Sequence, residues 1–378
     1  MLPVGQSLPF PIEVISGDRL SISIGPQHPG SGHFRIIVVL EGDIVAEAIP
    51  DAGYVHRGAE KLCEFRHFVQ NIPLLERTTL PDANGIIFPY VLAVEELMGI
   101  QAPQRAQYLR IIAAELNRIV SHLYWLGIYG PFLGHTTMFM WPMGDRELFM
   151  DLIQTIGGTR VTPSYIIPGG VRNDVPDYFK DQALKAIKYF ERRLKEYDKL
   201  FFSNPLVLKR TQGVGVLNRS DAVALGITGP NLRGSGLKSD TRKDETYSMY
   251  DTVDFDVPSY PDGDCWARNM VRFYELYWSM QIIKQAIEKM PSGPFRSRLP
   301  LLTARAPPGE VVARTEAARG CMSYYVVSDG SSKPYRVRVS VPSFRNIIGI
   351  PHLLKGGHLA DVPAIYWSLD YWPVEADK

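Results

Sequence analysis

The chain has 378 residues and a mass of 42.5 kDa, more than the usual length of one domain. It carries 41 Lys and Arg against 40 Asp and Glu, so it lacks the basic excess that a nucleic-acid-binding protein needs. Its 45% content of hydrophobic residues can fill a large core and excludes a disordered chain.

The three cysteines, Cys63, Cys265 and Cys321, lie far apart, and no C-x-x-C pair occurs. They cannot supply the four thiolates of an iron–sulfur cluster or a structural zinc site, and they are too few for a disulfide framework. The first ten residues lack the pattern of a signal peptide, and the most apolar stretch, 128–143, is interrupted by Gly and Pro. We therefore expect a soluble intracellular chain.

The first predicted elements are strands. Runs rich in β-branched residues at 12–15, 20–24 and 34–40 are followed by the turn Glu41-Gly42-Asp43 and a further short run at 44–46. From about residue 55 to 200 the hydrophobic period becomes helical. Pro103 is placed to begin a helix whose leucines and isoleucines recur every three or four residues up to Leu126, and its other faces carry Arg105, Arg110 and Arg118.

Two more helices are expected at 181–202, with a solvated lysine face, and at 267–290. Residues 203–266 and 291–320 are rich in Gly, Pro, Asp and Ser and are predicted to be long loops. A hairpin is predicted from strands at 323–327 and 335–341. The expected fold is α+β and mainly helical: a β region over 1–50, a helical core over 51–320, and a hairpin and tail over 321–378, all in one integrated domain.

Two segments carry candidate chemistry. The loop GPQHPGSGH at 25–33 is rigid and holds His28 and His33, so it can aim an imidazole at a ligand, but it can equally be a tight structural turn. The segment YVHRGAEK at 54–61 concentrates His, Arg, Glu and Lys. Its cations can stabilise a reduced centre nearby, or the segment can be a surface ion-pair network. These residues alone do not decide between the alternatives.

Other signatures are weak or absent. The glycine pairs at 169–170, 213–215 and 234–236 match neither G-x-G-x-x-G nor a Walker A loop, which disfavours a nucleotide-binding enzyme. No self-contained hydrolase motif occurs either. The residues by themselves therefore do not name a reaction.

A set of short sequence motifs in a fixed order does point to a family. They are GPQHP at 25–29, YVHRGAEK at 54–61, QNIP at 70–73, LAVEELMGI at 92–100, PQRAQYLR at 103–110, EL-x-R-x-x-SHL at 115–123, PGGVRNDVP at 168–176 and VSDGSSKPYRVRV at 327–339. Together they resemble the 49-kDa family of respiratory complex I, which is related to the large subunit of [NiFe] hydrogenases. The stretch TGPNLRGSG at 228–236 is most similar to archaeal membrane-bound relatives.

This resemblance implies a hydrogenase-like helical fold and a catalytic large subunit in the peripheral arm of an ion-translocating membrane complex, on the cytoplasmic side of the membrane. It implies that a partner small subunit carries the proximal [4Fe–4S] cluster and that this chain alone binds no cofactor. The further expected partners are other peripheral-arm subunits and membrane-arm subunits, including a protein similar to the H subunit of complex I. Nucleic acid is not expected to bind.

The resemblance also implies which branch of the superfamily is excluded. Hydrogenases carry R-x-C-G-x-C before the L-A-V-E helix, but here Thr79 and Asp82 follow Arg77 at the two cysteine places. Trp372 and Glu375 stand where the second, C-terminal cysteine pair would fall. Because nickel requires soft thiolates, we expect no [NiFe] site and no metal bound by this chain.

The quinone-reducing branch is also incompletely matched. Its quinone-binding tyrosine corresponds to Leu80, and its headgroup histidine corresponds to Gly32, with His33 one place further on. The resemblance to archaeal sulfane sulfur reductases therefore slightly favours a sulfane sulfur or polysulfide acceptor. The alternatives are a quinone or phenazine acceptor, as in complex I-like dehydrogenases, and a scaffold without catalytic function.

Residue roles are carried over position by position from this resemblance. His28, His33 and Asp82 are expected to supply protons to the acceptor. The substrate or the partner's cluster is expected to be surrounded by Arg57, Arg77, Arg172, Thr79 and Leu80. Glu375 and Asp377, in the C-terminal E-x-D-K motif, are expected to form a buried polar link toward the membrane subunits.

Overall fold

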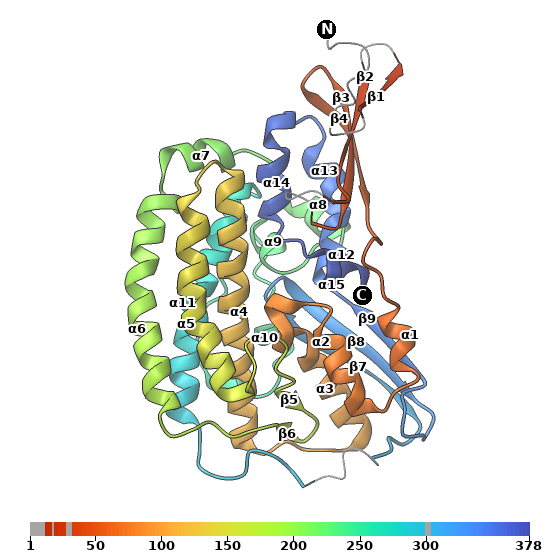
Figure 1. Cartoon of the computed structure of the whole chain (residues 1–378), viewed down its shortest axis with the longest axis vertical. Coiled ribbons are helices and arrows are strands. Elements are labelled where there is room, and N and C mark those ends of the chain that lie inside the picture. Colours follow the sequence, from red (N-terminus) through yellow and green to blue (C-terminus); the bar gives the residue numbers. More distant parts are fainter. Residues whose placement is uncertain (1–11, 17–18, 28–31, 299–303) are drawn as a thin grey trace.

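The computed structural model describes residues 12–16, 19–27, 32–298 and 304–378, so His28 lies outside the described residues. A bundle of long helices forms one side of the molecule, and a small sheet covered by short helices forms the other (Figure 1). A narrow β ribbon rises beside the C-terminal helices. The expectation of a mainly helical α+β fold with small β elements toward both ends is confirmed.

The ribbon is an antiparallel sheet in the order β1-β2-β3-β4. Its strands are Ile12–Ser16, Arg19–Ile24, Arg35–Glu41 and Ile44–Asp51, which confirms the predicted strand runs. The β3–β4 turn is held to the C-terminal part of the chain, because the Val45 amide donates to Gly357 O at 2.9 Å and the Leu359 amide donates to Asp43 O at 2.9 Å. The N-terminal sheet and the C-terminal helices therefore pack together although they are far apart in sequence.

The bundle consists of α4 (Gln104–Phe132), α5 (Thr137–Gly157), α6 (Phe179–Tyr197) and α11 (Cys265–Lys289), while α3 (Ala83–Met98) packs mainly against the C-terminal sheet. Helix α4 begins directly after Pro103, as predicted, and α6 and α11 match the two other predicted helices. The arginines Arg110 and Arg118 of α4 do not face solvent, because each is only 1% exposed. They are buried because α4 is the central helix, packed against α5, α11 and the small sheets on different sides.

Residues 203–266 are not one long loop. They contain the short helices α7 (Pro205–Thr211), α8 (Arg219–Ala224), α9 (Pro230–Arg233) and α10 (Thr241–Asp244), followed by a single 3-10 turn at Tyr250–Thr252. Asn and Asp side chains cap three of these helices by accepting from backbone amides. The same residues that suggested loops by composition therefore start short helices.

The C-terminal sheet has three strands, β7 (Gly309–Ala317), β8 (Gly320–Ser328) and β9 (Arg336–Ser340), in that order. The predicted hairpin corresponds to β8 and β9. Strand β7 was predicted to be part of the 291–320 loop, and that prediction is wrong. Its Glu and Arg residues obscured the strand pattern, but β8 pairs with it along all nine residues, from Gly309↔Ser328 to Ala317↔Gly320.

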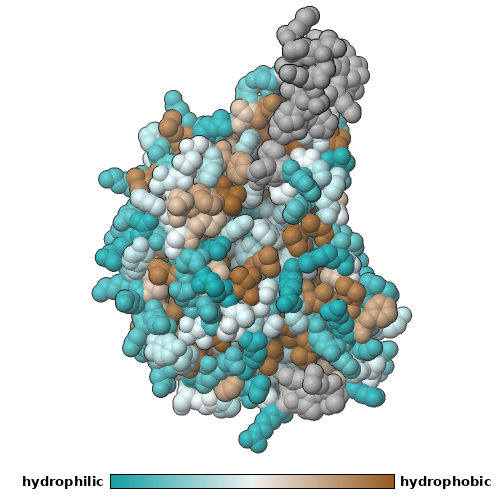
Figure 2. Space-filling model, viewed as in Figure 1, coloured by the Kyte–Doolittle hydropathy of each residue, from teal (hydrophilic) through white to brown (hydrophobic). Residues whose placement is uncertain are grey.

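Short elements complete the fold and surround the region where the β7–β8 turn meets the bundle. They are α1 (Ala59–Cys63), α2 (Asn71–Glu76), β5 (Ile166–Ile167), β6 (Gly170–Val171), α12 (Pro342–Asn346), α13 (Ile350–Leu354), α14 (Val362–Ser368) and α15 (Pro373–Asp377). On the face seen in Figure 2, apolar residues are interspersed with polar ones and are densest over the middle of the molecule. Among the described residues, no helix combines the length and the apolar character needed to cross a membrane.

The β7–β8 turn touches α9 backbone to backbone, so Gly320→Ala should be strongly destabilising. A Cβ at this position (φ +134°) would lie 2.8 Å from the Gly229 nitrogen. We expect a loss of about 3 kcal/mol in the free energy of unfolding, measured by chemical denaturation of the purified chain. Gly42→Ala is the control, because Gly42 also has a positive φ (+65°) but no atom within 4 Å, and should cost only ~1–2 kcal/mol. Equal losses in both variants would contradict the role of this contact.

Candidate functional site

The predicted site residues Thr79, Asp82 and Glu375 meet where two segments converge. Thr79 and Asp82 belong to the 3-10 turn and loop that lead into α3, and Glu375 lies in α15. The Thr79 hydroxyl donates to Glu375 Oε2 at 3.2 Å, across 296 residues of sequence. All three side chains are buried. The structure therefore brings these three positions together.

Asp82 is held by the β7–β8 turn. The amide of Ala318 donates to its Oδ2 at 2.7 Å, and the side chain is only 2% exposed. Burial raises the pKa of Asp82 to about 6, and the negative charge of Glu375 acts in the same direction. Gly85 makes this geometry possible, since a Cβ there would lie 2.4 Å from Asp82 Oδ1. Asp82 can therefore exchange a proton near neutral pH.

Three residues contact the Glu375 carboxylate. Besides Thr79, the Ser343 amide donates to its Oε1 at 2.9 Å, and Arg319 Nη1 lies 3.6 Å from its Oε2. Its burial raises its pKa above the ordinary range despite the nearby guanidinium. Asp82 and Glu375 thus form a pair of buried carboxyl groups around Arg319, and both have an increased affinity for protons.

Three predicted arginines, Arg57, Arg77 and Arg172, are exposed. Arg57 Nη2 donates to the carbonyl of Arg77 at 2.8 Å, and Arg77 Nη1 donates to the carbonyl of Pro73 at 2.8 Å. Arg172 donates to the carbonyl of Gly157. We call Arg57, Arg77 and Arg172 the arginine face. In the described part of the chain none of the three forms a salt bridge, so their charge remains available to an anionic partner.

Glu76 is a site residue that sequence reasoning missed. It is fully buried, and its carboxylate accepts from the amide of Ser164 at 2.8 Å and from the Ser164 hydroxyl at 2.7 Å. The charges of Arg77 and Arg172 both act on it and favour its ionised form. Burial nevertheless raises the pKa of Glu76 to about 7. Its position next to Arg77 was the only signal in the sequence.

The Asp377 carboxylate binds the backbone at the start of the YVHRGAEK segment, and we call this contact the Asp377 clamp. The carboxylate accepts from the amides of Gly53 at 2.8 Å and Val55 at 3.0 Å. Two residues of the segment, Glu60 and Lys61, do form ion pairs, as one of the two sequence interpretations predicted: Glu60 with Arg336 and Lys378, and Lys61 with Glu64. Arg57 is the member of the segment that belongs to the arginine face.

His33 and Leu80 are both exposed, Leu80 by 46%. The residue before His33, Gly32, has φ +63°, and a Cβ there would lie 3.3 Å from the Pro373 side chain in α15. The end of the GPQHP loop therefore packs beside the helix that carries Glu375. His33 makes no hydrogen bond within the described residues, and its role as a proton donor stays a prediction.

The side chains at the four thiolate positions do not fit a nickel site. They are a hydroxyl, two carboxyl groups and an indole, from Thr79, Asp82, Glu375 and Trp372. Within the described ranges no group of three His, Cys, Asp or Glu side chains is arranged to hold a metal ion. Cys63 is buried far from solvent, and burial raises the pKa of its thiol to about 12.

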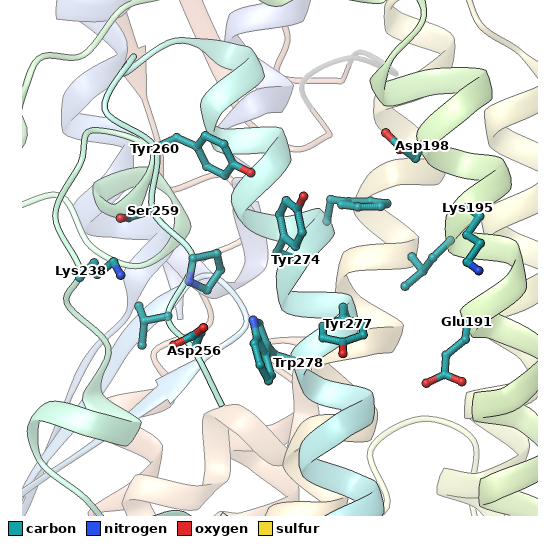
Figure 3. A pocket seen from close by; sticks show the side chains of 14 residues that line it. Glu191, Lys195, Asp198, Lys238, Asp256, Ser259, Tyr260, Tyr274, Tyr277 and Trp278 are labelled. Carbon is teal, nitrogen blue, oxygen red and sulfur yellow. The ribbon is translucent and has the colours of Figure 1, made fainter. Parts of the chain in front are cut away.

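A hollow of about 710 Å³ lies elsewhere, between α6, α11 and residues 256–260 (Figure 3). Tyr260, Tyr274, Tyr277 and Trp278 line it together with apolar side chains, and Lys195 and Asp198 lie at the α6 side. None of the predicted site residues lines this hollow. A smaller hollow of about 400 Å³ adjoins the Asp377 clamp and includes His56 and Lys378.

Asp82→Asn tests the burial of a carboxylate at this site. The folded-state pKa of about 6 exceeds the ordinary value of 3.8, so the stabilisation linked to Asp82 is complete below about pH 4 and is lost as the pH rises through 6. This shift corresponds to ~3 kcal/mol at neutral pH. As the pH rises from 4 to 7.5, the free energy of unfolding of the variant should therefore increase relative to that of wild type. A pH-independent difference in denaturant titrations would contradict the assignment.

Comparison with known proteins identifies the family to which the chain belongs. Residues 133–305 and 299–378 match the family described as "Respiratory-chain NADH dehydrogenase, 49 Kd subunit". The D subunit of NADH-quinone oxidoreductase from Desulforamulus reducens is 41% identical over 364 residues, covering 96% of this chain and 99% of that protein.

The D subunit of the same enzyme from Geobacillus thermodenitrificans is 42% identical over 362 residues, covering 95% of this chain and 99% of that protein. A chain in the solved structure of the membrane-bound sulfane sulfur reductase, an archaeal respiratory membrane complex, superimposes with a TM-score of 0.93 at 39% identity and covers 97% of this chain and 100% of that one. The chain belongs to the 49-kDa family of complex I-like respiratory oxidoreductases.

Proposed function

We propose that this chain is the catalytic large subunit of a membrane-bound, ion-translocating respiratory complex that reduces a sulfane sulfur or polysulfide acceptor. The observation that carries the proposal is that Arg57 contacts the exposed Arg77, whose segment continues to Thr79 and to the buried carboxyl groups of Asp82 and Glu375. Electrons are supplied by a [4Fe–4S] cluster in a partner small subunit. The solved structure of an archaeal sulfane sulfur reductase complex, in which one chain is 39% identical, supports this assignment.

The chemistry required of this site is simple. Cleavage of one S–S bond consumes two electrons and two protons and yields two thiols. An anionic polysulfide is attracted by Arg57 and Arg77, which are exposed and carry no salt bridge among the described residues. Asp82, whose pKa is raised to about 6 by burial, is a proposed buried proton donor, while His28 and His33 are the proposed donors on the GPQHP loop.

A quinone acceptor is the second candidate, and it rests on the bacterial relatives. The proteins from Desulforamulus and Geobacillus are named as subunits of NADH-quinone oxidoreductases and are about equally similar to this chain. Against this candidate, the position of the quinone-binding tyrosine is occupied by Leu80, whose side chain is 46% exposed and offers no hydrogen bond. A quinone headgroup would therefore have to be held by other residues, such as His33.

The proposed location follows from the same assignment. The chain is a peripheral subunit on the cytoplasmic side of the membrane. It contacts the small subunit at the arginine face, and other peripheral-arm and membrane-arm subunits elsewhere, including one similar to the H subunit of complex I. Glu375 and Asp377 lie in the short helix α15, and we assign them to the link between the site and those membrane partners.

Replacing Arg57 or Arg77 by Gln tests the arginine face in the intact complex. With a reduced ferredoxin-type donor, we expect kcat/KM for a polysulfide to fall by about tenfold or more, because a charge-assisted hydrogen bond contributes ~1.5–3 kcal/mol. Arg19→Gln is the matched control, since Arg19 is also an exposed arginine but pairs with Glu41 in the N-terminal ribbon. It should retain wild-type kinetics.

The same assay compares polysulfide with a soluble quinone analogue. Quinone reduction without sulfide release would replace the proposed acceptor by the second candidate. Normal turnover of fully assembled Arg57→Gln and Arg77→Gln complexes would instead indicate a scaffold and contradict catalysis at this site.

A further inference from the structure

Two residues of the segment between α5 and β5 have a strained backbone. Thr162 has φ +50° and Ser164 has φ +45°, in the left-handed region that non-glycine residues seldom adopt and β-branched residues avoid most. Thr162 also precedes Pro163, and a residue before proline is normally extended. Because strained backbone persists only where the surroundings maintain it, the contacts of this segment have to hold it in place.

The carboxylate of Glu76 supplies these contacts. The Ser164 amide donates to its Oε1 at 2.8 Å and to its Oε2 at 2.9 Å, and the Ser164 hydroxyl donates to Oε2 at 2.7 Å. Glu76 ends helix α2 and is fully buried. In the described part of the chain, all the hydrogen bonds of this carboxylate go to that one serine. The left-handed residue Ser164 is therefore fixed by a buried carboxylate, whose charge strengthens each bond.

The same segment places Arg172. The Arg172 amide donates to the carbonyl of Tyr165, the residue after Ser164, at 2.9 Å. Its guanidinium donates to the carbonyl of Gly157 at the end of α5. Gly157 in turn packs against the strained segment, since a Cβ at Gly157 would lie 2.4 Å from Pro163 Cβ. Both the backbone and the side chain of Arg172 thus bind residues that adjoin residues 162–165.

Glu76 is connected to a second exposed arginine through the chain itself. Arg77 is the next residue, and its Nη1 donates to the carbonyl of Pro73, in the same helix α2. The charges of Arg77 and Arg172 both act on the Glu76 carboxylate, in agreement with this connection. One buried carboxylate therefore joins the element that carries Arg77 to the segment that carries Arg172.

The tip of the β5–β6 hairpin is held by other groups. The Gly169 amide donates to Glu95 at 2.7 Å. Arg110 donates to the carbonyls of Ile167 at 2.8 Å and Gly170 at 3.1 Å. These contacts fix residues 167–170 independently of Glu76. Loss of the Glu76 carboxylate should therefore loosen residues 162–165 and leave the tip in place.

We propose that Glu76 is the positioning residue of the arginine face: its carboxylate holds the strained 162–165 segment and so fixes Arg172 relative to Arg77, which lets both guanidinium groups bind one anionic acceptor. Glu76 acts through Ser164 and does not touch the acceptor. A polysulfide carries negative charge at its two terminal sulfur atoms, so two fixed cations favour it over a neutral sulfane compound. The identity of this acceptor rests on the proposed function.

Hydrogen exchange in the full chain tests the structural part of the proposal. At pH 8 the carboxylate is ionised, because its pKa is about 7. In Glu76→Gln, amides in residues 158–166 should exchange about tenfold faster than in wild type, while those in 167–171 should be unchanged. Asp151→Asn is the matched control, since Asp151 pairs with Arg160 close to the same segment but is 66% exposed. It should alter neither rate.

Kinetics of the intact complex test the functional part. Glu76→Gln should raise KM for a polysulfide by about tenfold, because Arg172 is no longer held in position, and should leave kcat within about twofold. KM for dimethyl trisulfide, which is neutral, should stay within about twofold. Asp151→Asn should retain wild-type values for both acceptors.

Relief of the strain supplies a rescue that a general loss of stability would not show. Glycine adopts a positive φ without strain, so Thr162→Gly in the Glu76→Gln background should restore most of the polysulfide KM and slow the exchange of 158–166. Ser164→Ala is a milder variant that removes only the hydroxyl bond and keeps the two amide bonds. It should raise the polysulfide KM by about threefold, and it remains informative if Glu76→Gln does not fold.

Three results would overturn the proposal: unchanged exchange of 158–166 in both Glu76→Gln and Ser164→Ala, an equal rise in KM for the charged and the neutral acceptor, or no recovery with Thr162→Gly. Absence of polysulfide turnover in the wild-type complex would contradict the proposed function alone. The exchange rates would then still decide whether Glu76 positions the segment that carries Arg172.

Discussion

The buried ion cluster around Arg233 is the interaction on which the rest of the structure depends. Arg233 of α9 is fully buried and donates to Glu316 of β7 at 2.7 Å, to the Ser239 carbonyl at 2.8 Å and to Glu275 of α11. Removing one partner from such a cluster leaves an uncompensated charge in the core and typically costs ~3–5 kcal/mol. The cluster therefore joins the bundle, the short helices and the C-terminal sheet in one fixed arrangement.

This arrangement positions the candidate site. Glu316 fixes the end of β7, the next residues make the tight turn to β8, and the turn touches α9 at Gly229 and Gly320. From this turn, Ala318 holds the Asp82 carboxylate and Arg319 reaches Glu375 and Asp370. The chemical groups of the site are thus oriented by buried charges that do not themselves face it.

The site combines two electrostatic environments. Exposed guanidinium groups attract negative charge, while the buried carboxyl groups of Glu76, Asp82 and Glu375 have raised pKa values because they are desolvated. Electron arrival in such a place favours protonation of the carboxyl groups, since each added negative charge increases their proton affinity further. The chain is therefore a member of the 49-kDa family that combines an exposed Leu80 with three buried carboxyl groups of raised proton affinity.

Much of the fold could be predicted from the sequence, because local periodicity determines elements that bury one face. The strands before residue 51 and the helices α4, α6 and α11 were recognisable for that reason. Strand β7 and the short helices after residue 203 were not, since their charged residues are satisfied only by distant partners such as Arg233 and Glu316. A buried charge and a solvated charge have the same sequence signature.

For the candidate site, too, the sequence determined one part and the tertiary structure the other. The sequence by itself determined the family, because its short motifs occur in a fixed order. The same motifs marked Arg57, Arg77, Thr79, Asp82 and Glu375 as candidate site residues. Only the tertiary structure decided that the Thr79 hydroxyl reaches Glu375 across 296 residues, that the buried Glu76 carboxylate binds Ser164, and that Arg319 lies near both Glu375 and Asp370. Contacts between residues so far apart in the chain, and the pKa shifts that burial causes, arise from packing and leave no periodic pattern in the sequence.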